Sequence, residues 1–163
     1  MVTGTGKFKL LLLAVVAAIA ISCQPEIMYF GHFDFRSNEW NRQKTVRFEA
    51  EITDTLSAAR VDINLRTGSD YPYRNIYLFV STFAPGGERI TDTLEYMLAD
   101  EKGRRYGRGR GDIRELNLSY RDNVYFPRKG TYMFLIEHAM RTESLTGVYD
   151  IGIKISRQEG KRR

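Results

Sequence analysis

The residue with the most definite chemistry is the single cysteine, Cys23, which stands just before Pro25. Lys7 and Lys9 lie upstream, and residues 10–21 read LLLLAVVAAIAI without a polar side chain. A bilayer-spanning helix needs about 20 apolar residues, whereas the apolar core of an export signal needs roughly 7–15. The order of charge, apolar run and cysteine therefore indicates an export signal. Since no second cysteine exists, an internal disulfide is excluded.

The residues around the cysteine indicate which kind of export signal this is. A bacterial lipoprotein signal ends in a small residue followed by cysteine, and "AISC" resembles it, although Ala20 stands where leucine is usual. We expect cleavage after Ser22 and a diacylglycerol on the thiol of Cys23. The alternatives are an ordinary secreted protein and a cytosolic protein with a buried cysteine. The expected organisation is a lipoprotein signal peptide at 1–22 and a lipid-anchored domain at 23–163.

Charge and the residue after the cysteine bear on the partners and the location. The whole chain has 25 Lys+Arg and 20 Asp+Glu, and removal of Lys7 and Lys9 with the signal leaves 23 against 20, a net charge of +3. This mild excess does not require nucleic acid as a partner, and export makes that partner unexpected. We expect a cell-envelope protein held in a membrane through the lipid on Cys23. Gln24, in place of aspartate, favours the outer membrane.

The remaining titratable residues do not form a convincing catalytic or metal site. His32 and His138 are the only histidines, and each lies in an expected strand without nearby His or Cys partners. Both are expected to be structural histidines with satisfied hydrogen bonds. Acid pairs occur at Asp92 with Glu95 and at Asp112 with Glu115, but neither comes with an apolar pocket signature. We expect no enzymatic activity, no metal and no cofactor.

A basic, glycine-rich segment is the most unusual stretch of the sequence. We name residues 101–115, "EKGRRYGRGRGDIRE", the basic loop, which carries five positive charges between Lys102 and Arg110. It is interpreted as a solvated surface, as a contact for an acidic protein, or as a contact for lipid headgroups or another polyanion. The possible partner-contact residues are Arg104, Arg105, Tyr106, Arg108 and Arg110. The residues expected to shape the loop are Gly107, Gly109, Gly111 and Asp112, with Asp112 bonding back to loop amides.

Apolar and polar residues alternate through most of the chain after the cysteine, which is typical of strands with one face in a core. Strands are expected at residues 27–35, 44–52, 59–67, 74–84, 89–99, 131–140 and 148–156. Short strands at regular spacing predict a single all-β domain, an antiparallel β-sandwich of Ig-like or jelly-roll-like type. The stretch "FPRKGTY" predicts a turn that the hydroxyl of Tyr132 ties down.

Three tyrosines, Tyr71, Tyr73 and Tyr77, cluster around Pro72 beside an expected central strand. They are expected to cap the core of the sandwich. The alternative is a surface on which sugars stack or a protein partner is anchored.

Several longer stretches of the sequence occur in a characteristic order: "DTLEY…AD", "GRGRGDI", "FP..G.Y" and "AMR". In this combination they resemble the gliding-motility lipoprotein GldH family of Bacteroidetes. The resemblance implies a lipid-anchored envelope protein, in agreement with Cys23. It also implies a component or adaptor of the machinery for gliding, a movement tied to type IX secretion, with other envelope proteins as partners.

A surface lipoprotein that binds a glycan or small ligand is the alternative function, since β-sandwiches host such sites too. Exposed aromatic residues flanking a groove would favour it. A flat face beside the basic loop would favour the adaptor.

Overall fold

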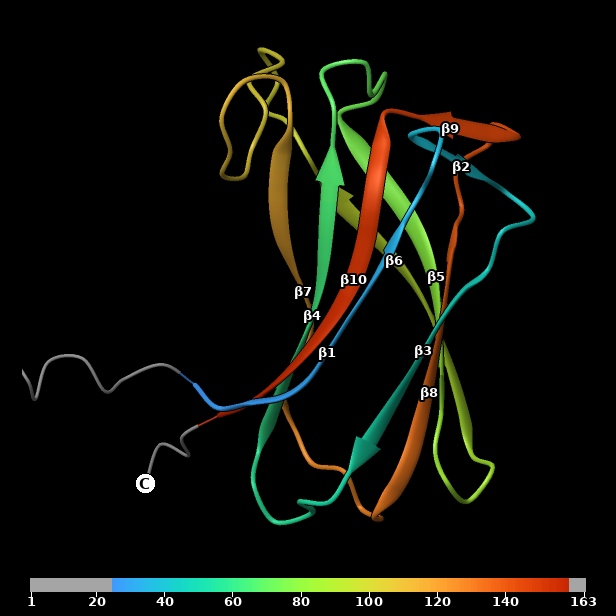
Figure 1. The fold of residues 1–163 in the computed structure, drawn as a ribbon, viewed down its shortest axis with the longest axis vertical. Helices are drawn as coiled ribbons and strands as arrows, with labels where there is room; N and C mark the ends of the chain where they lie inside the picture. Colours follow the sequence, from blue (N-terminus) through green and yellow to red (C-terminus); the bar gives the residue numbers. More distant parts are fainter. Residues whose placement is uncertain (1–24, 159–163) are drawn as a thin grey trace, which may run out of the picture.

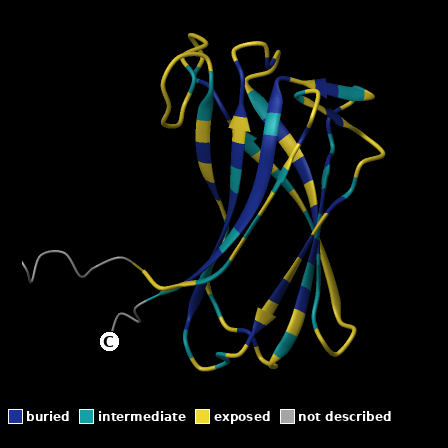
Figure 2. Cartoon of the chain, in the orientation of Figure 1, coloured by how far each residue is buried: buried dark blue, intermediate teal, exposed yellow. Residues whose placement is uncertain are grey.

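Alternation of buried and exposed side chains defines the strands of the computed structural model, which describes residues 25–158. In Val46–Ile52, every second side chain is buried. Figure 2 shows this alternation along several strands. Cys23 and the expected signal peptide lie outside the described residues. The ten strands are β1 (Ile27–Asp34), β2 (Glu39–Asn41), β3 (Val46–Ile52), β4 (Ala59–Thr67), β5 (Asn75–Phe83), β6 (Arg89–Met97), β7 (Arg114–Val124), β8 (Gly130–His138), β9 (Ser144–Thr146) and β10 (Val148–Arg157).

The strands form two four-stranded antiparallel sheets, with orders β1-β10-β4-β7 and β3-β8-β5-β6, and a small β2-β9 pair. The pairings are nested, because β1 pairs with β10, β3 with β8, β4 with β7 and β5 with β6. The chain thus runs out and back as one long antiparallel ribbon that is rolled into two sheets. This is a jelly roll, so the expected all-β sandwich is confirmed in its jelly-roll form.

The two sheets lie face to face, and their loops gather at the two ends of the long axis (Figure 1). The β6–β7 loop and the β2-β9 pair are at the upper end of the view, and the β3–β4 and β7–β8 turns are at the lower end. Facing side chains of both sheets form one core. Its fully buried large side chains are Trp40, Phe134, Ile52, Ile63, Leu65, Ile76, Leu78, Ile136, Leu145, Ile151, Ile153 and Ile155.

All seven expected strands are present, but three further strands were missed. The longest is β7, where buried Leu116 and Leu118 alternate with exposed Glu115, Asn117 and Ser119. That alternation was a usable signal for a strand. Strands β2 and β9 have three residues each, too few for a period to be recognised.

The turn before β8 has the expected tyrosine anchor. The hydroxyl of Tyr132 donates a hydrogen bond to the carbonyl oxygen of Arg128 at 3.1 Å. The Tyr132 ring is buried and packs edge-on against Phe126, with 4.8 Å between ring centroids. The turn is therefore held both by a polar bond and by the core.

Candidate functional site: the basic loop

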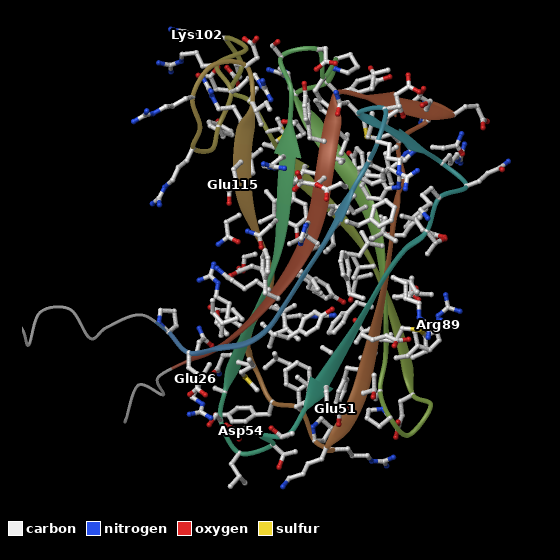
Figure 3. All side chains as sticks on the ribbon, in the orientation of Figure 1. Glu26, Glu51, Asp54, Arg89, Lys102 and Glu115 are labelled. Atoms are coloured by element: carbon white, nitrogen blue, oxygen red, sulfur yellow. The ribbon has the colours of Figure 1, made fainter. Side chains whose placement is uncertain are left out.

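The basic loop connects the end of β6 to the start of β7. Figure 3 shows Lys102 at one end of the sandwich and Glu26 and Asp54 toward the other. The segment leading into the loop is fastened to the neighbouring β4–β5 connection, because the amides of Leu98 and Ala99 both donate to the carbonyl oxygen of Arg74, at 2.7 and 3.1 Å. The loop is therefore attached to the body of the sandwich where it begins.

Asp100 organises the first turn of the segment. One carboxylate oxygen accepts the amide protons of Lys102 at 2.9 Å and Arg104 at 2.8 Å, and the other accepts the Arg104 Nε–H at 2.6 Å. These bonds, chiefly from Arg104, lower the pKa of Asp100 and keep it ionised. Arg104, expected as a partner contact, is thus paired within the loop.

Arg105 forms hydrogen bonds with the body of the protein and with its own loop. Its guanidinium donates to the carbonyl oxygen of Thr67 at 2.7 Å, to the Thr67 hydroxyl at 2.6 Å, and to the carbonyl oxygen of Asp112 at 2.8 Å. Burial, aided by the nearby positive charge of Arg114, lowers the pKa of Arg105. The side chain therefore latches the loop to the end of β4, in contrast to its expected role as a partner contact.

Three glycines give the second half of the loop its path. Gly107, Gly109 and Gly111 have φ values of 93°, 152° and 66°. A Cβ on Gly107 would lie 2.4 Å from the carbonyl oxygen of Glu115, and a Cβ on Gly109 would lie 2.2 Å from that of Ile113. Only glycine fits at these two positions without moving the backbone. Gly111 has open space around it.

Asp112 acts through its backbone carbonyl, which accepts from Arg105 as described above. The aspartate whose carboxylate accepts loop amide protons is Asp100, so the expectation placed this role on the wrong aspartate. The sequence "DEKG" at residues 100–103 carried a signal for it, since aspartate is common at the first position of a turn.

Three cations of the loop and its tyrosine lie at the surface. Lys102, Tyr106, Arg108 and Arg110 are exposed. Within residues 25–158, the ion pairs closer than 4.0 Å include Arg104 with Asp100 but none from Lys102, Arg108 or Arg110. The backbone of Arg108 is nevertheless ordered, because it exchanges two hydrogen bonds with that of Glu115, at 2.9 and 2.7 Å. The loop thus presents unpaired cations from a defined backbone.

Neither histidine is the satisfied structural residue that was expected. His32 is exposed on the outer face of β1, with its Nε2 3.5 Å from a carboxylate oxygen of Asp34. His138 is buried edge-on to Trp40, and both of its ring nitrogens lack a hydrogen-bond partner within the described structure. Burial lowers the pKa of His138, which therefore stays neutral.

Residues 25–158 contain neither a cluster of His, Cys, Asp and Glu that could hold a metal ion nor a helix long and apolar enough to cross a membrane.

Two hollows lie away from the basic loop. One, of about 440 Å³, is lined by Tyr73, Tyr77, Ala139, Met140 and Arg141. The other, of about 260 Å³, is an apolar groove whose walls include Ile90, Tyr120, Tyr125 and Phe126. Tyr71 caps the core as expected, and its hydroxyl donates to the Asn75 carbonyl oxygen at 2.8 Å, whereas Tyr73 and Tyr77 are exposed.

Comparison with known proteins identifies the family. The GldH lipoprotein family matches residues 28–155, which include the whole basic loop and nearly all of the sandwich. The chain belongs to the GldH lipoprotein family. A GldH relative, the gliding motility lipoprotein GldH of Flavobacterium johnsoniae, is 30% identical over 91% of this chain and 96% of its own length. The GldH homolog of Christiangramia forsetii is 34% identical over 75% of this chain and 80% of its own.

Solved structures outside the GldH family show only a distant likeness. Pseudomonas aeruginosa AlgX aligns with a TM-score of 0.37 and 12% identity over 86% of this chain and 28% of its own. The VP2 subviral particle of infectious bursal disease virus aligns with a TM-score of 0.37 and 12% identity, over 83% of this chain and 32% of its own. Scores this low carry no argument about function.

Proposed function

We propose that this protein is a lipid-anchored, non-enzymatic adaptor of the envelope machinery for gliding motility and the type IX secretion linked to it. Its family and the names of its relatives support a lipoprotein role in gliding. The proposed anchor is the lipid on Cys23, in the outer membrane, and the proposed contact for other envelope proteins is the basic loop.

The adaptor proposal rests on a difference among the cations of the loop, of which some bond within the protein and others are exposed. Arg104 and Arg105 form hydrogen bonds within the protein, and these bonds hold the loop in place. Lys102, Arg108 and Arg110 remain exposed on that ordered backbone. A preorganised loop loses less conformational freedom on binding than a flexible one, so its charges are well suited to recognition.

The chemistry of these side chains indicates an acidic protein surface as partner. Arg108 and Arg110 can each bind a carboxylate with two parallel hydrogen bonds, and exposed Tyr106 between the charges offers an amphipathic ring for contact. Such an interface depends on charge, so it should weaken as salt shortens the Debye length from about 10 Å at 0.1 M to about 3 Å at 1 M.

Affinity capture from detergent-solubilised envelopes tests the proposal. We expect the double substitution Arg108→Gln with Arg110→Gln to weaken capture of a specific envelope protein roughly 2- to 30-fold, since each exposed charge pair contributes about 0.2–1 kcal/mol. The matched control is Arg36→Gln with Arg42→Gln, which removes the same charge from exposed turn positions. Equal capture by both variants, with normal gliding of the host, would remove the basic loop from the proposed function.

The hollow beside Tyr73 and Tyr77 keeps glycan or small-ligand binding as a second candidate. Two exposed aromatic rings and Arg141 around one depression offer stacking and hydrogen bonding together. Tyr73→Ala and Tyr77→Ala should abolish retention on an envelope-glycan affinity column if this candidate is correct. The candidate would be ruled out if the wild type were not retained on the column. It would also be ruled out if both variants were retained as well as the wild type.

A further inference from the structure

Very little chain separates the proposed lipid from the folded domain. Only Gln24, Pro25 and Glu26 lie between Cys23 and Ile27, the first residue of β1. A fully extended residue spans at most about 3.5 Å, so the four steps from Cys23 to Ile27 reach no more than about 14 Å. A lipid on Cys23, as in the proposed function, would therefore hold one part of the sandwich directly against the bilayer.

The pairing of the strands shows which part that is. Ile27 pairs with Ser156 near the end of β10, and the next residue, Arg157, pairs with Ala59 at the start of β4. Ala59 in turn pairs with Val124, the last residue of β7. The beginning of β1 therefore lies in one row with the β3–β4 and β7–β8 turns. We name this end, comprising residues 26–27, 53–58 and 125–129, the anchor pole.

One arginine joins the entry of the chain to the β3–β4 turn. Arg157 binds a carboxylate oxygen of Glu26 through Nη1 and one of Asp54 through Nη2, each at 2.7 Å. The other oxygen of Asp54 accepts the amide protons of Leu56 at 2.9 Å and Ser57 at 3.1 Å. Hydrogen bonds from Ser57, Leu56 and Arg157 hold the pKa of Asp54 well below its usual range. The turn that presents Leu56 is thus built beside the point where the chain enters.

The anchor pole exposes apolar side chains that water does not favour. Leu56 is 88% exposed, Ile27 60% and Tyr125 56%. Transfer of leucine and isoleucine side chains from water to the acyl boundary of a membrane is favourable, and tyrosine is enriched at the level of the headgroups. The charges of Glu26, Asp54 and Arg157 largely satisfy one another. Arg128 pairs with Glu88 at 3.1 Å, and Lys129 is exposed at the same end. The end therefore combines apolar side chains suited to insertion into an interface with one lysine that can contact headgroup phosphates.

We propose that the anchor pole rests on the phospholipid bilayer that holds the Cys23 lipid, with Leu56 inserted at the interface. Strand β4 then runs away from the membrane, from Ala59 at the anchor pole to Thr67, where Arg105 latches the basic loop. Eight steps of about 3.3 Å place the loop some 26 Å from the anchor pole, several Debye lengths at physiological salt. The geometry assigns the basic loop to a protein partner above the membrane and not to the lipid headgroups.

The test uses the full lipidated chain, reconstituted into vesicles of phosphatidylethanolamine and phosphatidylglycerol. Since Cys23 is the only natural cysteine and is blocked by lipid, Leu56→Cys supplies a unique site for an environment-sensitive fluorophore. The matched control is Met97→Cys, an exposed apolar position at the end of β6 that enters the basic loop. We expect the label at position 56 to be quenched by lipid-borne nitroxides and to be several-fold less accessible to aqueous iodide than the label at 97.

A label-free measurement guards against an effect of the fluorophore. Hydrogen exchange of the unlabelled protein should slow at amides 53–58 on vesicles and stay unchanged at amides 103–111. Equal iodide access at positions 56 and 97 in protein that floats with the vesicles would overturn the orientation. Failure to float would overturn the lipid anchor itself. Because the vesicles contain no partner protein, equal iodide access leaves the adaptor role untouched. Failure to float contradicts the Cys23 anchor of the proposed function, whereas the basic-loop contact is tested separately by affinity capture.

Discussion

The guanidinium of Arg105 holds both the carbonyl and the hydroxyl oxygen of Thr67, at 2.7 and 2.6 Å. The two residues are 38 positions apart in the chain, and their contact joins the basic loop to the last residue of β4. This contact separates two kinds of arginine in one short segment. Arg105 maintains the loop, whereas Arg108 and Arg110 are available to a partner.

Replacement of Arg105 should therefore reduce stability more than replacement of its neighbours. We expect Arg105→Gln to lower the free energy of unfolding by about 1.5–3 kcal/mol, the range for hydrogen bonds from a charged group. Arg108→Gln should stay within about 0.5 kcal/mol, as is usual for exposed side chains. Urea unfolding of both variants measures the difference. Equal stabilities would mean that the latch contributes nothing in solution.

The loss of stability on substituting each loop glycine should depend on how closely other backbone atoms approach it. Gly107→Val and Gly109→Val force a Cβ against the carbonyl oxygens of Glu115 and Ile113, so both should destabilise the domain and weaken partner capture. Gly111→Asn should cost less than about 1 kcal/mol, since asparagine tolerates positive φ and space is open there. Thermal melting ranks the three variants. A larger loss for Gly111→Asn would contradict this account.

Regular alternation made much of the fold predictable. In "VRFEAEI" the polarity of each residue predicts whether its side chain faces the core or the solvent, because successive side chains of a strand point to opposite faces. In β7 the alternation is equally clear at Leu116 and Leu118, but Arg121, Asp122 and Asn123 follow without it. The nested pairing that makes this sandwich a jelly roll depends on contacts between distant segments, and the sequence alone left the Ig-like form open.

The same limit applies to the candidate site. The glycines of the basic loop predicted a bent backbone, and their positive φ values agree with that. Which arginine would bond to the body of the sandwich could not be foreseen, because its partner, Thr67, lies on another strand. Asp100 differs in this respect, because its place at the start of "DEKG" was a usable signal for the carboxylate that accepts the amide protons of Lys102 and Arg104.

The core prediction for β8 can be tested at Ile136, which was expected to face inward and is fully buried. Ile136→Ala should lower the free energy of unfolding by about 2–5 kcal/mol, through lost transfer free energy and the cavity left behind. Ile90→Ala is the matched control, because Ile90 is 58% exposed and should cost under about 1 kcal/mol. Chemical denaturation of both variants decides, and similar losses would place Ile136 outside the core.

Cys23→Ala tests the lipid attachment, which remains a prediction. The variant should lose all incorporation of a clickable fatty acid and should accumulate uncleaved precursor, because the thiol is the proposed attachment point. Gln24→Ala, which leaves the thiol in place, should label like the wild type. The readout is in-gel fluorescence at matched protein levels. Equal labelling of Cys23→Ala and the wild type would refute the lipoprotein assignment of this residue.

The pH dependence of stability should report on His138. Its pKa is lowered in the folded protein by burial, whereas an unfolded chain has the ordinary histidine value near 6.5. Below about pH 6.5 the unfolded state therefore binds more protons than the folded state. The stabilisation is fully present above that pH and is lost as the pH falls toward the folded-state pKa, with a slope of at most about 1.4 kcal/mol per pH unit.

Substitution of His138 isolates this contribution from the carboxylates that titrate in the same range. His138→Leu removes the titrating ring and its two unpartnered nitrogens, so the variant should lose less stability than the wild type between about pH 6.5 and 5. His32→Gln is the control for the removal of a histidine from an exposed position. Urea midpoints measured across this pH range provide the comparison. Parallel profiles for wild type and His138→Leu would show that His138 is not kept neutral by the fold.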